Sequence, residues 1–336
     1  MTTLLAGDIG GTKTLLSLYR CGGGGLEPLV SERYVSGEWP DLAPMVLAFL
    51  GGPVAAAGLA QPEAACFAVA GPVQAGQARL TNLPWQLSER DLATTTGIGR
   101  LALVNDFAVL IYGLPHLQPD QQAQVRPGVA VADAPLLVLG AGTGLGVAYG
   151  VPTPAGLVAI ASEGSHGEFA PRSAEEWQLK QWLQADLGLD RLSTERVVSG
   201  TGLGLVARWM LATQGAAHGH PLAAVADDPA QDLPAAVAQA ATAGDPLAQQ
   251  ALALWLSAYG SVTGDLALAA LCRGGIWLAG GTAAKLVEAL RSPVFSQGFL
   301  NKGRLGAVLE PIPITAITDP GIGLFSAACR ARMLVG

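Results

Sequence analysis

The chain has 336 residues, 50% hydrophobic and only 13% charged, which indicates a globular protein with enough apolar side chains for two cores and excludes a disordered one. A formal net charge of −7 leaves no basic surplus to neutralise nucleic-acid phosphates, so we expect no nucleic-acid partner. An acidic chain that handles an anionic ligand must bind it through local groups such as backbone N–H.

The first predicted elements are two strands joined by a glycine turn. Apolar runs flank the turn GDIGGTKT at residues 7–14, and the segment after it has the pattern of a strand. The turn matches neither common phosphate signature, because the chain has no Gly-Lys pair and the turn does not open a helix. Glycines still let the backbone approach a ligand closely, and such turns often cradle phosphate.

The rest of the first half predicts further alternating elements. A hairpin turn (CGGGG), a third strand and a helix follow by residue 50, and a buried strand begins near residue 64. We then expect a helix capped at Ser88, a strand that ends at Asn105 and Asp106, and another helix. Polar residues from about 115 to 135 predict a connection.

The opening pattern recurs at residues 135–151 as PLLVLGAGTGLGVAYGV, which indicates an internal duplication of strand, glycine turn and strand. Later segments predict a long buried helix with a core strand after it, a Gly-Gly turn before a helix near residue 280, and a closing strand and helix. This alternation favours two α/β domains that face each other across a cleft, where ligands bind.

The two glycine turns together predict a grip on the phosphate tail of a nucleotide. Backbone N–H groups and the hydroxyls of Thr12 and Thr143 would donate to phosphate oxygens, and Asp8 would hold Mg²⁺, directly or through water. One such turn alone is best read as a tight β-turn. Two matching turns that both keep a threonine favour binding.

Carboxylates and one histidine are the other chemical candidates. Asp106, at the tip of a buried strand, is suited to take a proton from a substrate hydroxyl, although Asn-Asp pairs are equally common in turns and caps. Glu163 and His166 share a glycine-flanked loop that suits the hydroxyls of a polyol. Glu195 stands at a predicted helix start, where a capping or helix-dipole role is about as good an interpretation.

The four cysteines have no paired spacing, so we expect ordinary buried thiols and no structural zinc site. The opening residues lack a basic segment ahead of an apolar run. A long apolar segment near residues 251–281 is interrupted by Asp265 and Arg273, which favours a buried helix over a membrane span. We therefore expect a cytoplasmic protein with no membrane partner.

Together these motifs resemble the bacterial ATP-dependent glucokinases. The matching segments, from residue 4 to about 330, are GDIGGT, LTNLPW, LVNDF, GAGTGLG, EGSH, ERVVSGTGL, LAGGT and DPGIGL. The resemblance implies the two-domain actin-like/hexokinase-like (ribonuclease H-like) fold, with a small domain at 1–112 plus 312–336 and a large one at 113–311. It implies transfer of the γ-phosphoryl of ATP, with Mg²⁺, to the 6-hydroxyl of glucose, as the first step of glycolysis, by a homodimer.

The resemblance also implies a role for each matched residue. Asp106 matches the catalytic base. The sugar hydroxyls would be bound by Asn105, Asp106, Glu163, His166 and Glu195. The nucleotide would be bound by Gly7, Asp8, Ile9, Gly10, Gly11 and Thr12 in the first turn, by Gly142, Thr143 and Gly144 in the second, and by Gly280 and Gly281 near the adenosine.

Some residues depart from the family pattern and keep the choice of sugar open. Lys13 stands where many members carry Asn, and GGTK also occurs in the related ROK sugar kinases, but their cysteine-rich zinc motif is missing here. Ser165 replaces a frequent glycine, and AGPV at 70–73 replaces a commoner Cys-Pro version. The alternatives are a kinase for mannose, fructose or an N-acetyl amino sugar, or a non-catalytic sugar sensor on the same fold.

Overall fold

The computed structural model describes residues 2–23, 25–80, 82–215 and 219–336. Gly24 of the predicted CGGGG turn and Thr81 of the LTNLPW motif lie outside the described residues. The chain forms two compact units, one of Met1–Gln118, Ala148–Ala161 and Asp319–Gly336 and one of Pro119–Val147 and Ser162–Thr318. The domain boundaries drawn from the resemblance remain a prediction.

Five strands form the sheet of the first unit, in the order β3-β2-β1-β4-β8. Their bounds are β1 Thr2–Ile9, β2 Lys13–Gly22, β3 Gly25–Val35, β4 Ala64–Val69 and β8 Leu101–Asn105. The first three are antiparallel neighbours, which confirms the two predicted opening strands, whereas β4 and β8 run parallel to β1. Ile9 pairs with Val69 and Val69 with Asn105, so β1, β4 and β8 end at one edge of the sheet.

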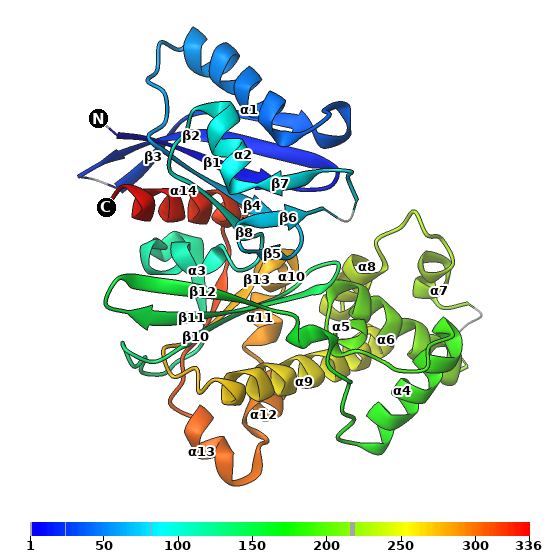
Figure 1. Ribbon diagram of the computed structural model, residues 1–336. Helices are drawn as coiled ribbons and strands as arrows, with labels where there is room; N and C mark the ends of the chain where they lie inside the picture. Colours follow the sequence, from blue (N-terminus) through cyan, green and yellow to red (C-terminus); the bar gives the residue numbers. More distant parts are fainter. Residues whose placement is uncertain (1, 24, 81, 216–218) are drawn as a thin grey trace. The chain divides into compact units, whose positions relative to one another are not determined.

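Helices cover both faces of this sheet (Figure 1). Leu5 and Ile9 of β1 pack into one core with α1 (Leu42–Phe49) and α2 (Glu89–Thr96). On the opposite face α14 (Ile322–Val335) contacts β1 and β4. The apolar residues of β1 are therefore buried on both faces of the sheet, and only Asp8 near its end is exposed.

Smaller elements surround this end of the sheet. A three-stranded sheet consists of β5 (Val73–Gln74), β6 (Gln77–Arg79) and β7 (Gln86–Ser88). The predicted cap of α2 is confirmed, since Ser88 Oγ accepts a hydrogen bond from the Asp91 N–H at 3.3 Å. The helix predicted after Asp106 is shorter than expected, because residues 106–109 form a turn before α3 (Leu110–Gly113).

A second sheet has six strands in the order β12-β11-β10-β13-β14-β9. Their bounds are β9 Gln122–Arg126, β10 Leu136–Ala141, β11 Leu145–Thr153, β12 Gly156–Ser162, β13 Ile276–Ala279 and β14 Ile314–Ile317. The turn between β10 and β11 is the predicted recurrence of the opening pattern. The polar stretch predicted as a connection contains β9, which pairs antiparallel with β14 and buries only Val125.

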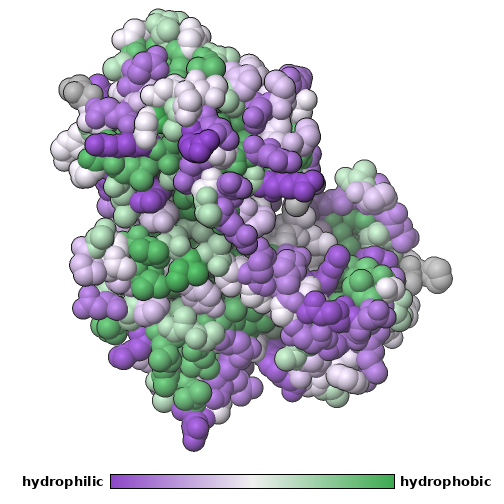
Figure 2. All heavy atoms as spheres, viewed as in Figure 1, coloured by the Kyte–Doolittle hydropathy of each residue, from purple (hydrophilic) through white to green (hydrophobic). Residues whose placement is uncertain are grey.

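The edge strand β12 presents apolar side chains to solvent. Val158 is 47% exposed and Ile160 is 49% exposed, and they alternate along the strand. Figure 2 shows apolar surface over this strand on the visible face. Edge strands with such side chains can pair with another chain.

The second unit carries most of the helices. They are α4 Ala174–Leu187, α5 Thr194–Val197, α6 Gly200–Thr213, α7 Pro221–Ala226, α8 Leu233–Thr242, α9 Pro246–Ala269, α10 Gly280–Lys285, α11 Val287–Leu290, α12 Pro293–Leu300 and α13 Gly306–Leu309. Among the described residues only α9 is long and apolar enough to cross a membrane, and most of its apolar window is buried inside the protein. It contacts α6, α8 and α12, so it is a core helix, as predicted.

Glycines allow α9 and α12 to pack closely. A Cβ on Gly260 would overlap with the Phe295 carbonyl oxygen, and one on Gly298 would overlap with the Ser257 carbonyl oxygen. The two backbones are therefore in direct contact, which larger side chains would prevent. Gly264, four residues after Gly260, serves the same contact, because a Cβ on it would overlap with the Phe299 carbonyl oxygen.

Candidate active site

Asp106 lies at the carboxyl end of β8, where neighbouring groups fix its backbone and side chain. Its N–H donates to the Val69 carbonyl oxygen at 2.9 Å, which continues the pairing of β4 and β8 by one residue. Asn105 Oδ1 accepts hydrogen bonds from the N–H groups of Phe107 at 3.1 Å and Ala108 at 3.0 Å. Asn105 thus ends the strand and starts the turn, which is the local reason for the Asn-Asp pair.

The electrostatics of this strand end are unusual for an aspartate that solvent reaches. Loss of hydration raises the pKa of Asp106 to about 6, and the nearby Asp8 carboxylate adds to the rise. Hydrogen bonds from the Phe107 and Asp106 N–H groups and from Asn105 lower that pKa in part. Burial also raises the pKa of Asp8, against the opposing effect of Lys13. A carboxylate with such a pKa is ionised at neutral pH and still a useful proton acceptor.

The first glycine turn divides into a buried part and an accessible part. Gly7 and Ile9 are buried in β1, and a Cβ on Gly7 would lie 2.6 Å from the Phe67 ring, so both residues shape the strand. Gly10 N–H donates to the Lys13 carbonyl oxygen at 3.0 Å and closes the turn. Gly10 and Gly11 are half-buried, and Asp8 and Thr12 are exposed to solvent.

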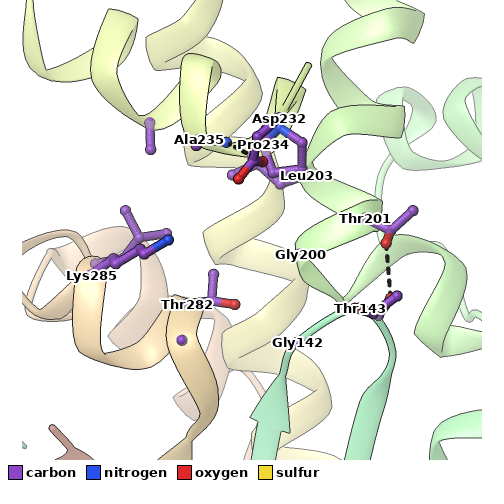
Figure 3. A pocket seen from close by; sticks show the side chains of 13 residues that line it. Gly142, Thr143, Gly200, Thr201, Leu203, Asp232, Pro234, Ala235, Thr282 and Lys285 are labelled. Atoms are coloured by element: carbon purple, nitrogen blue, oxygen red, sulfur yellow. Dashed lines mark hydrogen bonds between the residues drawn. The ribbon is translucent and has the colours of Figure 1, made fainter. Parts of the chain in front are cut away.

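The second glycine turn is held by a hydrogen bond within it and by two from residues 200–201, which are distant in sequence. Gly142 N–H donates to the Gly144 carbonyl oxygen at 2.8 Å within the turn. Gly200 N–H donates to the Gly142 carbonyl oxygen at 2.7 Å, and Thr201 Oγ1 donates to the Thr143 carbonyl oxygen at 2.9 Å (Figure 3). These bonds place the N-terminus of α6 directly beside the turn.

A pocket of about 340 Å³ opens next to this turn in the second unit (Figure 3). Its lining includes Gly142, Thr143 and Gly281, as predicted for the nucleotide, and Gly280 adjoins them with a φ of 85° that suits glycine. Sequence reasoning missed the other lining residues, which are Gly200, Thr201, Leu203, Asp232, Pro234, Ala235, Ala238, Thr282, Lys285 and Leu286. Gly200 and Thr201 belong to the motif ERVVSGTGL, and Thr282 belongs to LAGGT. The residues of α8 that line the pocket, which we call the α8 wall, belong to no motif.

The pocket combines an N-terminal helix end with an apolar wall. Gly200 and Thr201 bring the N-terminus of α6, the helix end that favours anions, to the pocket, and Ser199 Oγ caps it by accepting from the Gly202 N–H. Pro234, Ala235 and Ala238 supply a flat apolar face from α8. The arrangement suits a ligand with phosphates at one end and an aromatic base at the other.

Glu163 and His166 lie together in the loop after β12, as predicted. His166 Nε2 is 3.6 Å from Glu163 Oε2, and both side chains are more than half exposed. A side chain outside the loop binds its backbone, since Arg191 Nη2 donates to the His166 carbonyl oxygen at 2.6 Å. The Thr194 N–H donates to the Gly167 carbonyl oxygen at 2.8 Å, which ties the loop to α5.

Glu195, in the first turn of α5, reaches the second glycine turn. Its Oε2 accepts a hydrogen bond from the Leu145 N–H at 2.9 Å, at the start of β11. The N-cap residue Ser193 makes no side-chain cap hydrogen bond, and Glu195 lies in the first turn of α5, where the helix-dipole interpretation still applies. A half-buried carboxylate thus connects the helix beside the Glu163 loop with the turn that lines the pocket.

Among the described residues there is no group of three or more His, Cys, Asp or Glu side chains that could hold a metal ion. A Mg²⁺ ion carried by nucleotide phosphates needs only one or two protein carboxylates. Asp8 and Asp106 are close enough for one to raise the pKa of the other. This pair of neighbouring carboxylates fits a divalent cation.

Comparisons with known proteins agree with these observations. The model of the glucokinase family matches residues 5–334. The glucokinase of Synechocystis sp. is 41% identical, over 98% of this chain and 98% of its own length. A solved glucokinase from an Antarctic psychrotroph has a TM-score of 0.83 at 28% identity, over 99% of both chains. The Balamuthia mandrillaris glucokinase, solved with glucose, has a TM-score of 0.74 at 22% identity, over 98% of this chain and 94% of its own, and shares the fold. These similarities confirm the predicted hexokinase-like fold.

Proposed function

Since the chain belongs to the glucokinase family, we propose that Asp106 is the general base that takes the proton of the glucose 6-hydroxyl. The chain is an ATP-dependent glucose kinase, which converts glucose and ATP to glucose 6-phosphate and ADP. The observation that carries the assignment is the carboxylate at the end of β8, held by Asn105 and with its pKa raised to about 6. Proton transfer to a positioned carboxylate of that pKa is efficient near neutral pH.

The nucleotide is proposed to bind in the pocket beside the second glycine turn. The N-terminus of α6 and Thr143 would face the phosphates, and Gly280 and Gly281 would lie near the adenosine, against the α8 wall. The first turn, from Gly7 to Thr12, would contact the transferred phosphoryl group. Such transfer depends mainly on positioning and on stabilisation of the phosphate charge.

Magnesium fits the carboxylates of the first unit. Asp8 would hold the ion, directly or through water, with Asp106 nearby. When bound, Mg²⁺ neutralises phosphate charge during transfer.

The sugar is proposed to bind to Glu163, His166, Glu195 and Asn105. Sugar hydroxyls both donate and accept hydrogen bonds. The carboxylates can accept hydrogen bonds from them, and the imidazole can donate one. Asn105 already uses both side-chain atoms within the chain, so its larger contribution is to hold Asp106. Water is the competing nucleophile, so we expect phosphoryl transfer to require bound sugar.

A cytoplasmic homodimer is proposed as the working form. The exposed apolar side chains of the edge strand β12 support an interface between two copies. An Ile160→Lys variant should then elute as a monomer in gel filtration with light scattering.

A coupled assay for ADP release, with Mg-ATP and a panel of hexoses, tests the proposed function. Release that depends on glucose supports it, whereas release only with mannose, fructose or an N-acetyl amino sugar changes the substrate and keeps the mechanism. ATP binding without sugar-dependent release would indicate a sugar sensor and overturn the role of Asp106.

A further inference from the structure

Glu195 has two carboxylate oxygens in different surroundings. Oε2 is engaged with the Leu145 N–H at 2.9 Å. No hydrogen bond to Oε1 occurs within the part of the chain that the structure describes. One oxygen therefore holds the second glycine turn, and the other is left for a ligand.

The backbone next to Glu195 is hydrogen-bonded to the segment that follows Glu163 and His166, which we call the sugar loop. Besides the bond from Thr194 N–H to the Gly167 carbonyl oxygen at 2.8 Å, Glu168 and Ser193 form an antiparallel bridge. A displacement of the Glu163 loop must therefore be transmitted to Glu195.

The Glu195 carboxylate also lies close to the backbone of the second glycine turn. A Cβ on Gly144 would overlap with Glu195 Oε2, so the carboxylate packs directly against the turn backbone. The same turn lines the nucleotide pocket through Gly142 and Thr143. Glu195 thus connects the loop of Glu163 and His166 with the 142–144 turn through direct contacts.

From these contacts we propose that Glu195 is a positioning residue for the 142–144 turn, and that it couples sugar binding to nucleotide binding. The inference rests on the proposed function, because it assigns a sugar hydroxyl to Oε1. A sugar that engages Oε1 fixes the carboxylate, and the fixed Oε2 holds the turn in the geometry that binds phosphates. Charge-assisted hydrogen bonds to backbone N–H are strong enough for this role.

Coupling of this kind is reciprocal. If glucose raises the affinity for a nucleotide, the nucleotide must raise the affinity for glucose by the same factor. Factors of about 5 to 150 are typical of such coupling. A residue that only binds sugar would change glucose affinity and leave the factor unchanged.

The test measures binding of the non-hydrolysable analogue AMPPNP with Mg²⁺ by calorimetry, with and without saturating glucose. Gly144→Ala places a methyl group against Glu195 Oε2 from the side of the turn. We expect it to weaken glucose binding at least about fivefold and to bring the coupling factor close to one. Gly323→Ala in α14 is the matched change outside the proposed site, and its Cβ would meet nothing within 4 Å. It should leave glucose affinity unchanged.

A second variant keeps the proposal falsifiable if Gly144→Ala unfolds. Glu195→Gln retains an oxygen for the Leu145 N–H and should keep a coupling factor clearly above one, whereas Glu195→Ala should lose it. Thermal melts establish that each variant is folded. Wild-type coupling that survives in both Gly144→Ala and Glu195→Ala would overturn the inference while glucose-dependent turnover still stands. Absence of glucose-dependent turnover in the wild type would instead overturn the proposed function.

Discussion

Asn105 Nδ2 donates a hydrogen bond to Asp106 Oδ1 at 3.0 Å, between side chains adjacent in sequence. The orientation of the amide is fixed, because Oδ1 accepts from the N–H groups of Phe107 and Ala108 and leaves Nδ2 to face the carboxylate. Nδ2 also donates to the Gly71 carbonyl oxygen at 3.1 Å. One oxygen of Asp106 is thereby positioned before any substrate binds.

Asp106→Ala removes the proposed base. We expect kcat to fall about 100-fold or more, as loss of a general base typically does, with a smaller change in the KM for ATP. Steady-state kinetics with glucose and Mg-ATP measures both constants. Asp106→Asn, nearly the same in shape, should lose as much activity, since an amide takes up no proton. Near-normal turnover in both variants would remove Asp106 from the mechanism.

Asp8→Asn removes the carboxylate that helps to raise the pKa of Asp106. The base must be ionised, so kcat/KM should fall as the pH drops through about 6 in the wild type. Without the like charge of Asp8, the ionised form is easier to reach, and the acid limb should move to lower pH. The readout is the midpoint of the pH profile. The plateau value of kcat/KM is not suitable, because Asp8 is also the proposed magnesium ligand and its loss changes that value. An unmoved midpoint would show that the two carboxylates are not coupled.

Asn105→Asp should move the same midpoint in the opposite direction. The new carboxylate still accepts from Phe107 and Ala108, but it cannot donate to Asp106 and adds a like charge beside it. The pKa of Asp106 should therefore rise and the acid limb shift to higher pH. A profile identical to that of the wild type would mean that Asn105 acts only on the backbone.

Gly260→Ala tests the contact between α9 and α12. Its Cβ would overlap with the Phe295 carbonyl oxygen, so the helices must separate, and we expect a loss of roughly 1–3 kcal/mol in the free energy of unfolding. Gly323→Ala in α14 is the control, because its Cβ meets nothing within 4 Å, and it should be neutral or slightly stabilising. Denaturant unfolding compares the two. Equal stability in both variants would contradict close packing at Gly260.

The sequence predicted what depends on local pattern. The apolar runs on both sides of GDIGGTKT were enough for β1, β2 and their turn, and Ser88 was recognisable as a cap. The strand β9 was missed because an edge strand with one buried residue, Val125, has no apolar signature. Edge strands of this kind are specified by their partner, here β14.

The site was predictable only where a residue carries chemistry of its own. Asp106 and the Glu163–His166 pair stood out by residue type and place in the chain. The α8 wall did not, because Pro234 and Ala235 are ordinary helix-start residues that gain a role only from the turn far earlier in the chain. The bond of Glu195 to Leu145 spans 50 residues and likewise depends on the tertiary fold.

The glycines of α9 show why an apolar sequence alone does not distinguish a membrane-spanning helix from a helix buried in a protein core. By length and hydropathy alone the helix would suit a lipid bilayer, and small residues four apart are also what pairs helices there. Here the same spacing brings α12 into backbone contact inside a protein core. This effect of the glycine spacing is purely steric, so it operates in a bilayer and in a protein core alike. Two glycines four residues apart therefore indicate a closely packed helix neighbour, but not whether lipid or protein surrounds the pair.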